Sequence, residues 1–179
     1  MENKITVIKI VAAALILVFL VTCIPRNINI EYPAIRYSEN DSDAAIQTSV
    51  VIKGKLFKPL FFSSRFEGTF IVEEYDFSKE YKLMDVSFGR GFDKRGTLVY
   101  YTYNVEEGGS DIKYTGSDIK HIGSIWISGN MDRICILGIS PEYAETEGAY
   151  AYEPIIISAP AETREDAVQI ADQLIPEDY

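Results

Sequence analysis

The chain begins with a long apolar run that carries no charge. The run covers Ile10–Ile24, and Lys4 and Lys9 precede it. As a helix its 15 residues rise about 22 Å, which is less than the roughly 30 Å hydrocarbon core of a bilayer. If Lys9 extends its ammonium group to the headgroups, Ile5–Ile8 can join the helix and bring it to the roughly 20 residues that spanning requires. The pattern predicts a transmembrane helix within residues 1–26.

Positive charge sets the expected orientation of this segment. Lys4 and Lys9 precede the run, whereas only Arg26 closely follows it. Because Lys and Arg are enriched on the cytoplasmic side of membrane segments, we expect a cytoplasmic N-terminus and an extracytoplasmic remainder. The expected location is the cell membrane, which the chain crosses once.

The same segment has two other interpretations. Leu20-Val21-Thr22-Cys23 resembles the lipobox of bacterial lipoproteins, in which a leucine stands three residues before a lipid-carrying cysteine. Thr22 departs from this motif, which favours Gly, Ala or Ser before the cysteine. A retained signal anchor, a lipoprotein anchored through Cys23 and a cleaved secretion signal therefore stay open, although no A-x-A-like cleavage site supports the third.

The stretch after the membrane segment is more polar. Residues 27–47 contain few long apolar runs and include Glu39-Asn40-Asp41-Ser42-Asp43. Such a composition is typical of a linker. We therefore expect a membrane segment at 1–26, a tether at 27–47 and an extracytoplasmic domain at 48–179.

From Thr48 onward the pattern is mostly that of β-strands. The segments are short, rich in β-branched and aromatic residues, and bounded by Gly, Pro, Asn or Asp. About seven strands are predicted, at 48–57, 68–75, 81–88, 97–105, 121–128, 133–140 and 149–158.

Two of these predictions have local detail. Tyr81–Phe88 alternates, so Met84 and Val86 are expected on one face of a single strand. Gly129-Asn130-Met131-Asp132 is expected to be a short hairpin loop, with its glycine and asparagine available for positive φ.

The end of the chain changes to a helical period. Thr163 and Asp166 resemble a capping box, and Pro176 ends the run. These signals predict an amphipathic helix that covers a sheet, and hence an α+β fold: an antiparallel sheet or partly closed barrel with the helix on one face or end. The apolar residues of this helix recur at i, i+3, i+4 and i+7, at Ala167, Ile170, Ala171 and Leu174.

Composition narrows the possible chemistry. The 179 residues include two cysteines and one histidine, which excludes a disulfide framework, a Cys/His zinc site and a multi-histidine metal centre. Residues 1–26 hold three basic residues and one acidic residue, so the remainder has 14 basic and 26 acidic residues and a net charge of −12, against −10 for the whole chain. This excess of acid disfavours contact with nucleic acid and anionic lipid, and it favours a neutral or cationic partner.

One glycine-rich basic cluster, Gly89–Gly96, is a candidate anion contact. Its backbone amides could cradle an anion, with Arg90, Lys94 and Arg95 as counter-charges. It lacks the order of a phosphate-binding loop and is followed by a strand rather than a helix. A hairpin loop with solvated charges is the other interpretation.

Three further sets of side chains are of types that can carry chemistry. His121 begins an apolar strand without a nucleophile motif in the chain, which indicates a surface residue rather than a catalytic one. Cys135 lies in an apolar run and is expected to be a small buried hydrophobe. Tyr100, Tyr101 and Tyr103 cluster on one strand, with Tyr101 and Tyr103 on the same side, and either contact a partner or pack over the sheet. No catalytic, cofactor-binding or metal-ligating residue is predicted.

Three blocks of the sequence support a resemblance. Together they resemble small membrane-anchored or lipoprotein-like extracytoplasmic proteins of Gram-positive bacteria. The resemblance implies export and a compact domain, and it implies no activity. The blocks are Lys58–Phe61 continuing through Arg65–Phe70 to Tyr75–Phe77, then Gly123–Ile127, then Ser158–Ala161.

These observations favour a non-enzymatic protein: a single-pass membrane protein whose external domain is a binding, accessory or sensory module of the cell envelope. The first alternative is an envelope hydrolase that uses Asp and Glu carboxylates, which would need two inward-facing acids in a cleft. The second is an assembly subunit in which the membrane helix makes the contacts.

Overall fold

Antiparallel strands make up most of the structure, which is a computed structural model. It describes residues 9–11, 24–38, 45–59, 62–89, 94–108, 111–141 and 154–176. The strands are β1 (Arg26–Ser38), β2 (Ala45–Phe57), β3 (Arg65–Val72), β4 (Lys82–Leu83), β5 (Val86–Ser87), β6 (Arg95–Gly108), β7 (Asp111–Ile127), β8 (Ile134–Ile139) and β9 (Pro154–Ala159), and the helices within the domain are α2 (Phe77–Glu80) and α4 (Arg164–Leu174).

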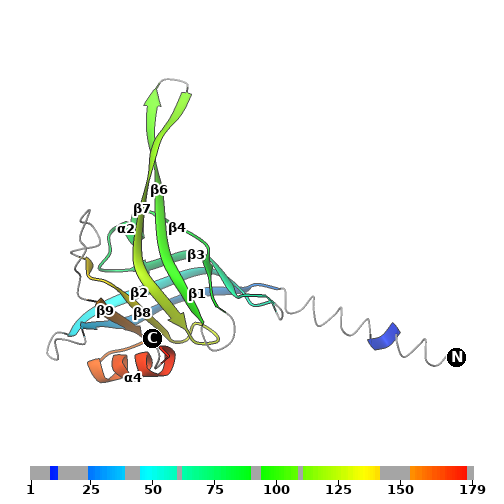
Figure 1. The fold of residues 1–179 in the computed structure, drawn as a ribbon, viewed down its shortest axis with the longest axis vertical. Helices are drawn as coiled ribbons and strands as arrows, with labels where there is room; N and C mark the ends of the chain where they lie inside the picture. The colour runs from blue at the N-terminus through cyan, green and yellow to red at the C-terminus, as the bar shows by residue number, and fades with distance from the viewer. Residues whose placement is uncertain are drawn as a thin grey trace.

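The strands form one sheet that nearly closes into a barrel. Its order is β4-β6-β7-β8-β9-β1-β2-β3-β5, and every neighbouring pair is antiparallel. β4 and β5 are two halves of one interrupted strand, because β4 pairs with β6 while β5 pairs with β3. The strands therefore follow one another around the barrel in the order in which they occur in the chain. Figure 1 shows β1, β2 and β3 side by side, crossing the lower part of the tall β6–β7 pair.

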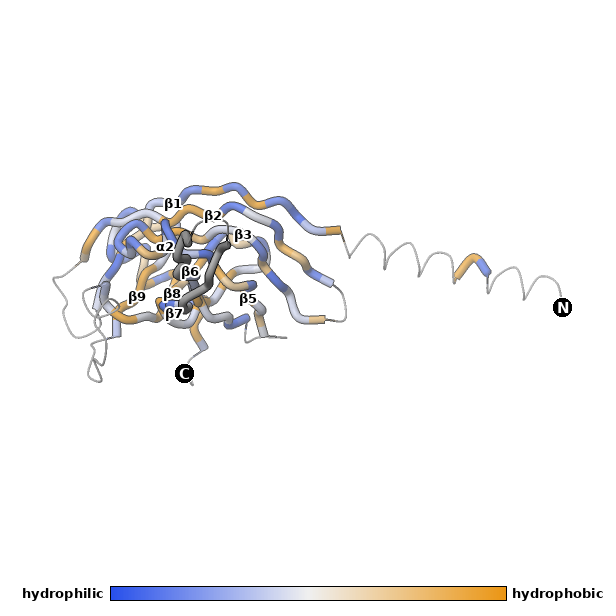
Figure 2. Tube along the Cα trace, turned by 90° about the horizontal axis from the view of Figure 1, so that it is seen from above, coloured by the Kyte–Doolittle hydropathy of each residue, from blue (hydrophilic) through white to orange (hydrophobic). Residues whose placement is uncertain are grey.

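The core lies between the strands and follows from the alternation of the sequence. In β2, Val50, Ile52 and Leu56 are buried, whereas Lys53 and Lys55 are exposed. Successive side chains of a strand point to opposite faces, so one face of each strand lines the barrel and the other meets solvent. The tube coloured by hydropathy in Figure 2 shows this alternation along the strands.

The C-terminal helix covers part of the outer surface, as predicted. α4 contacts β9, β1 and β8, and its residues Ala167, Ile170 and Ala171 form a second buried cluster with side chains of those strands. Its capping box is confirmed: Asp166 N donates to Thr163 Oγ1 at 3.2 Å, and Thr163 N donates to Asp166 Oδ2 at 3.1 Å. The Thr163 hydroxyl, which donates to Asp166 Oδ2 at 2.8 Å, and then the Thr163 backbone amide lower the pKa of Asp166.

Two pairs of facing glycines let neighbouring strands approach closely. Gly54 lies opposite Gly68 between β2 and β3, and Gly123 lies opposite Gly138 between β7 and β8. A Cβ on Gly68 would lie 2.2 Å from the Lys53 carbonyl oxygen, and a Cβ on Gly123 would lie 2.2 Å from that of Leu137. Only glycine fits such contacts, which are typical of tight bends in barrels.

The sequence prediction of a tether at 27–47 is wrong for most of that range. Residues 27–38 belong to β1, which pairs with β2 along its length and with β9 near its end. Ile28 and Ala34 are buried in the barrel core, and Ile35 and Tyr37 are buried under α4. β1 is thus a structural strand that joins the two ends of the sheet.

The described residues form nine strands, not about seven. β1 is one addition, and the other arises because the predicted strand at 81–88 is split into β4 and β5. β6 ends at Gly108 and β7 begins at Asp111, so both strands continue beyond the ranges predicted for them, 97–105 and 121–128. The antiparallel sheet with a C-terminal helix is confirmed at this coarser level.

The predicted hairpin between β7 and β8 is present, but the positive φ falls elsewhere. Met131 has φ 59°, rather than the glycine or asparagine of the loop. The Met131 side chain is fully buried in the barrel core. Burial of this side chain offsets the strain that a non-glycine residue bears in that region.

Among the described residues, none of the helices has the length and apolar character needed to cross a bilayer. Most of the predicted membrane segment, residues 1–8 and 12–23, lies outside the described residues. Its membrane helix therefore stays a prediction.

Candidate functional site

The β6–β7 hairpin extends beyond its neighbours as an arm. β4 pairs with β6 only at Tyr100 and Tyr101, and β8 pairs with β7 only from Gly123 onward. β6 and β7 continue to pair with each other as far as Gly108 and Asp111. Figure 1 shows the arm rising well above the rest of the barrel.

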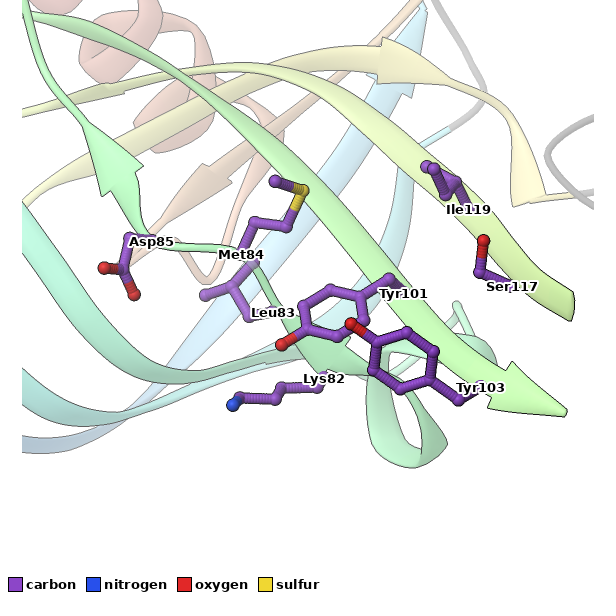
Figure 3. A pocket seen from close by; sticks show the side chains of 8 residues that line it. All are labelled: Lys82, Leu83, Met84, Asp85, Tyr101, Tyr103, Ser117 and Ile119. Atoms are coloured by element: carbon purple, nitrogen blue, oxygen red, sulfur yellow. The ribbon is translucent and has the colours of Figure 1, made fainter. Parts of the chain in front are cut away.

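A groove of about 560 Å³ lies at the base of this arm, on the outer side of the sheet. Figure 3 shows that its walls come from β4 with the two residues after it and from facing positions of β6 and β7. Most of these side chains are apolar or aromatic. The groove is lined by Lys82, Leu83, Met84, Asp85, Tyr101, Tyr103, Ser117 and Ile119.

Strand register explains why these side chains share a face. Tyr101 lies opposite Ile119, and Tyr103 lies opposite Ser117. The rings of Tyr101 and Tyr103 meet edge to face with centroids 5.4 Å apart, and Lys82 Nζ lies 5.8 Å from the Tyr101 ring centroid. These contacts position the two tyrosine rings at the base of the arm.

The groove exposes apolar surface to solvent. Tyr103 is 58% exposed, Ile119 61% and Met84 48%. A gathering of large apolar side chains on a surface is characteristic of a binding site, whereas single ones are common on any protein.

Tyr100 lies on the opposite face and has a structural role. It is fully buried, and its hydroxyl donates to the Phe70 carbonyl oxygen at 2.7 Å. Its ring also meets Phe77 edge to face, with centroids 5.4 Å apart. Burial raises the pKa of its hydroxyl. The tyrosine cluster of the sequence is therefore divided by the pleat into one core residue and two groove residues.

The groove carries one charged side chain of each sign. Among its lining residues Asp85 is the one carboxylate and Lys82 the one ammonium. In the part of the chain that the structure describes, no group of three or more His, Cys, Asp or Glu side chains is placed to hold a metal ion.

The candidate anion contact is not part of this groove. Lys94 is exposed just before β6, and Arg95 is its first residue, at the end of the strand remote from the arm. Arg90 lies outside the described residues, as does Cys23, the candidate lipidation site.

Two other residues singled out from the sequence have structural positions. His121 is exposed on β7 and lies opposite Val99. Cys135 is fully buried beneath α4, as predicted, and accepts a hydrogen bond from Ser158 Oγ at 3.7 Å. Burial raises the pKa of its thiol to about 12.

Sequence reasoning identified the tyrosines of the groove but not its other residues. It placed Met84 and Val86 on one face, yet Val86 is buried and Met84 is exposed. The reason is the break between β4 and β5, which interrupts the alternation. Ile119 was missed because residues 112–120 were not predicted as strand, although β7 covers them.

Comparison with known proteins finds no matching family model, no similar curated protein and no similar solved structure.

Proposed function

We propose that this protein is a non-catalytic binding module of the cell envelope, attached to the membrane by its N-terminal segment. The groove holds an extended segment of a partner polypeptide. The observation that carries this proposal is the gathering of exposed Met84, Tyr103 and Ile119 beside an edge of β6 that continues past β4.

The strand edge favours a polypeptide over a small molecule. No strand among the described residues pairs with this edge of β6 beyond Tyr101. Backbone N–H and C=O groups along such an edge are a template for an added strand, and neighbouring hollows accept its alternate side chains. A partner strand in line with β4 would lie along the arm, with the groove beside it.

Charge favours a neutral or basic partner. The chain after residue 26 has a net charge of −12, and β6 carries Glu106 and Glu107 beyond the groove. An aromatic groove also favours Lys or Arg side chains of the partner. The contact would therefore attract a basic segment and disfavour an acidic one.

The hydrolase alternative has less support from the groove. Carboxylate-dependent hydrolysis needs two acids that converge on one substrate bond. Asp85 alone supplies a carboxylate among the lining residues, and it lies 3.9 Å from Arg65. Binding requires no second acid.

Site-specific photo-crosslinking in the full-length protein tests the proposal. A photoreactive amino acid replaces Tyr103 in one sample and Ile46 in the control, because Ile46 is 44% exposed but does not line the groove. We expect adducts at position 103 that map to one neutral or basic segment of a single partner. Equal yields at both positions, or adducts scattered over many proteins, would contradict the proposal.

Hydrogen exchange tests the mode of binding. A synthetic peptide of the crosslinked segment should slow amide exchange in residues 102–108 of the full-length protein at least tenfold. Tyr103→Ala with Ile119→Ser should remove this protection, whereas Ile46→Ser should leave it unchanged. Protection confined to other strands would exclude strand addition.

A further inference from the structure

Positive side chains collect at the end of the barrel where β1 begins. Arg26 starts β1 and lies opposite Leu56, two residues before Lys58. Lys58 Nζ donates to Asn130 Oδ1 of the β7–β8 hairpin at 3.3 Å. Lys94 directly precedes β6. The amide of Gly89, which lies shortly after β5, donates to the Arg95 carbonyl oxygen at 2.9 Å. Segments far apart in sequence thus bring basic residues to one end.

These cations act on one another. Burial, followed by the nearby charges of Arg26 and Lys94, lowers the pKa of Lys58, and the carboxylate of Asp132 opposes this effect. The positive charges of Arg26 and Lys94 are therefore close enough to repel that of Lys58. A negatively charged surface placed against them would relieve that repulsion.

Two exposed apolar side chains lie in the same end segments. Ile24, just before β1, is 69% exposed, and Phe62, between β2 and β3, is 63% exposed. Neither lines the groove at the arm. Apolar side chains next to basic ones are the combination found in proteins that lie on membrane surfaces, where the former enter the headgroup region and the latter meet lipid phosphates.

We infer that this end of the barrel rests on the anionic headgroups of the membrane, with Phe62 and Ile24 in the interface and Arg26, Lys58 and Lys94 against lipid phosphates. The occupant is a lipid surface because the apolar run Ile10–Ile24 leads directly into this end. The arm then projects from the opposite rim of the sheet, where β6 and β7 continue past β4 and β8.

The inference rests on one part of the proposed function, the attachment of the N-terminal segment to the membrane, and not on the groove. It also changes the expectation from net charge. The excess of acid belongs to the whole domain, but the field falls off within roughly 10 Å at physiological salt, so the local charges decide what this end contacts.

Quenching by brominated lipid tests the inference in the full-length protein in vesicles. Phe62→Trp reports on this end, and Ile46→Trp, at the far end of β2, is the matched control. Wild-type protein supplies the background, because its one tryptophan, Trp126, is 1% exposed. In vesicles with 30% phosphatidylglycerol we expect at least threefold stronger quenching of position 62 than of position 46.

Charge reversal separates docking from mere tethering. Each basic residue near an anionic surface increases the partitioning of a protein onto that surface about fivefold. Lys94→Glu alone should therefore reduce the docked fraction. Arg26→Glu with Lys94→Glu should reduce it to the level in neutral phosphatidylcholine. Lys79→Glu, on α2 at the other end, should have no effect.

The outcomes are distinct. Equal quenching at positions 62 and 46 would overturn the inference. So would quenching at position 62 that changes neither with lipid charge nor on Arg26→Glu with Lys94→Glu. Failure of the wild-type protein to sediment with any vesicle would instead refute membrane attachment. Neither result would alter crosslinking at position 103, which tests the groove.

Discussion

The two ends of the barrel differ in how they arrange charge. At the arm end, two basic residues are paired: Arg36 Nε lies 2.9 Å from Glu74 Oε2, and Lys79 Nζ lies 2.8 Å from Asp76 Oδ1. At the end where β1 begins, the charged groups that act on Lys58 are two cations and one carboxylate. These two pairs are each neutral, whereas the group around Lys58 keeps a net positive charge, so that group is the better suited to an anionic surface.

The ends also differ in how they expose apolar surface. At the arm, Met84, Tyr103 and Ile119 share one groove formed by three segments. At the other end, Ile24 and Phe62 come from separate connecting segments. A shared groove suits one shaped partner, whereas separate side chains suit a soft surface such as a lipid interface.

Disrupting the barrel between the two ends should remove both surfaces. Gly123→Ala places a Cβ 2.2 Å from the Leu137 carbonyl oxygen, and only a movement of the backbone can relieve this clash. We expect a loss of about 3 kcal/mol or more in the free energy of unfolding. The measurement is urea unfolding of the full-length protein in detergent, followed by Trp126 fluorescence.

Gly129→Ala is the control for this substitution, because nothing lies within 4 Å of the added Cβ. Its effect should stay within about 0.5 kcal/mol. Equal stability of the two variants would show that β7 and β8 do not approach as closely as the register requires.

The neighbouring tyrosines of β6 should separate stability from binding. Tyr100→Phe leaves the buried Phe70 carbonyl oxygen without the hydroxyl that donates to it, which should cost about 1–3 kcal/mol. Tyr103→Phe should change stability by less than about 0.5 kcal/mol. The same urea titration distinguishes the two, and a larger loss for Tyr103→Phe would refute the assignment of Tyr103 to the surface.

Helix α4 belongs to neither end and provides an independent comparison. Thr163→Ala removes the N-cap and should cost about 1 kcal/mol. The thiol of Cys135 lies beneath α4, so its labelling by a maleimide, located by mass spectrometry, should become faster. Thr69→Ala, at an exposed position on β3, is the control, and neither variant should alter lipid quenching at position 62.

The hydrophobic periodicity and the capping residues predicted those elements that the local sequence determines. The α4 helix follows from the spacing of Ala167 and Ile170 and from the Thr163–Asp166 box. β1 was missed although Ile28, Ile30 and Tyr32 alternate toward the core, because at Ala34 and Ile35 the alternation ends. There α4 covers the outer face, so both faces are buried, and that is a tertiary effect.

The groove was less predictable than the sheet for the same reason. Tyr101 and Tyr103 were placed together from the strand period, and the structure confirms their shared side. Met84 and Ile119 join them only because the strand breaks between β4 and β5 and because β7 extends into the arm. Both events depend on how distant strands pair, which a local pattern does not contain.

Removing the carboxylate that acts on Lys58 should sharpen the contrast between the ends. Asp132→Asn adds one unit of positive charge beside Lys58, so we expect the docked fraction on phosphatidylglycerol vesicles to rise about fivefold. Asp118→Asn, which alters the carboxylate that accepts from Tyr81 at 2.8 Å on the arm side, is the matched control. Equal changes in docking for the two variants would mean that total charge, not its location, governs contact with lipid.

The same substitution has a pH signature. The hydrogen bond from Ser128 is the main cause of the lowered pKa of Asp132. Because the folded pKa lies below that of the unfolded chain, about 3.9, the bond stabilises the fold above roughly pH 4 and is lost as pH falls through the folded value. Thermal unfolding between pH 2 and 7 should therefore show a slightly larger acid-dependent loss in wild type than in Asp132→Asn. If both proteins lose stability equally, the hairpin carboxylate does not contribute to the fold, and its effect on lipid contact is electrostatic alone.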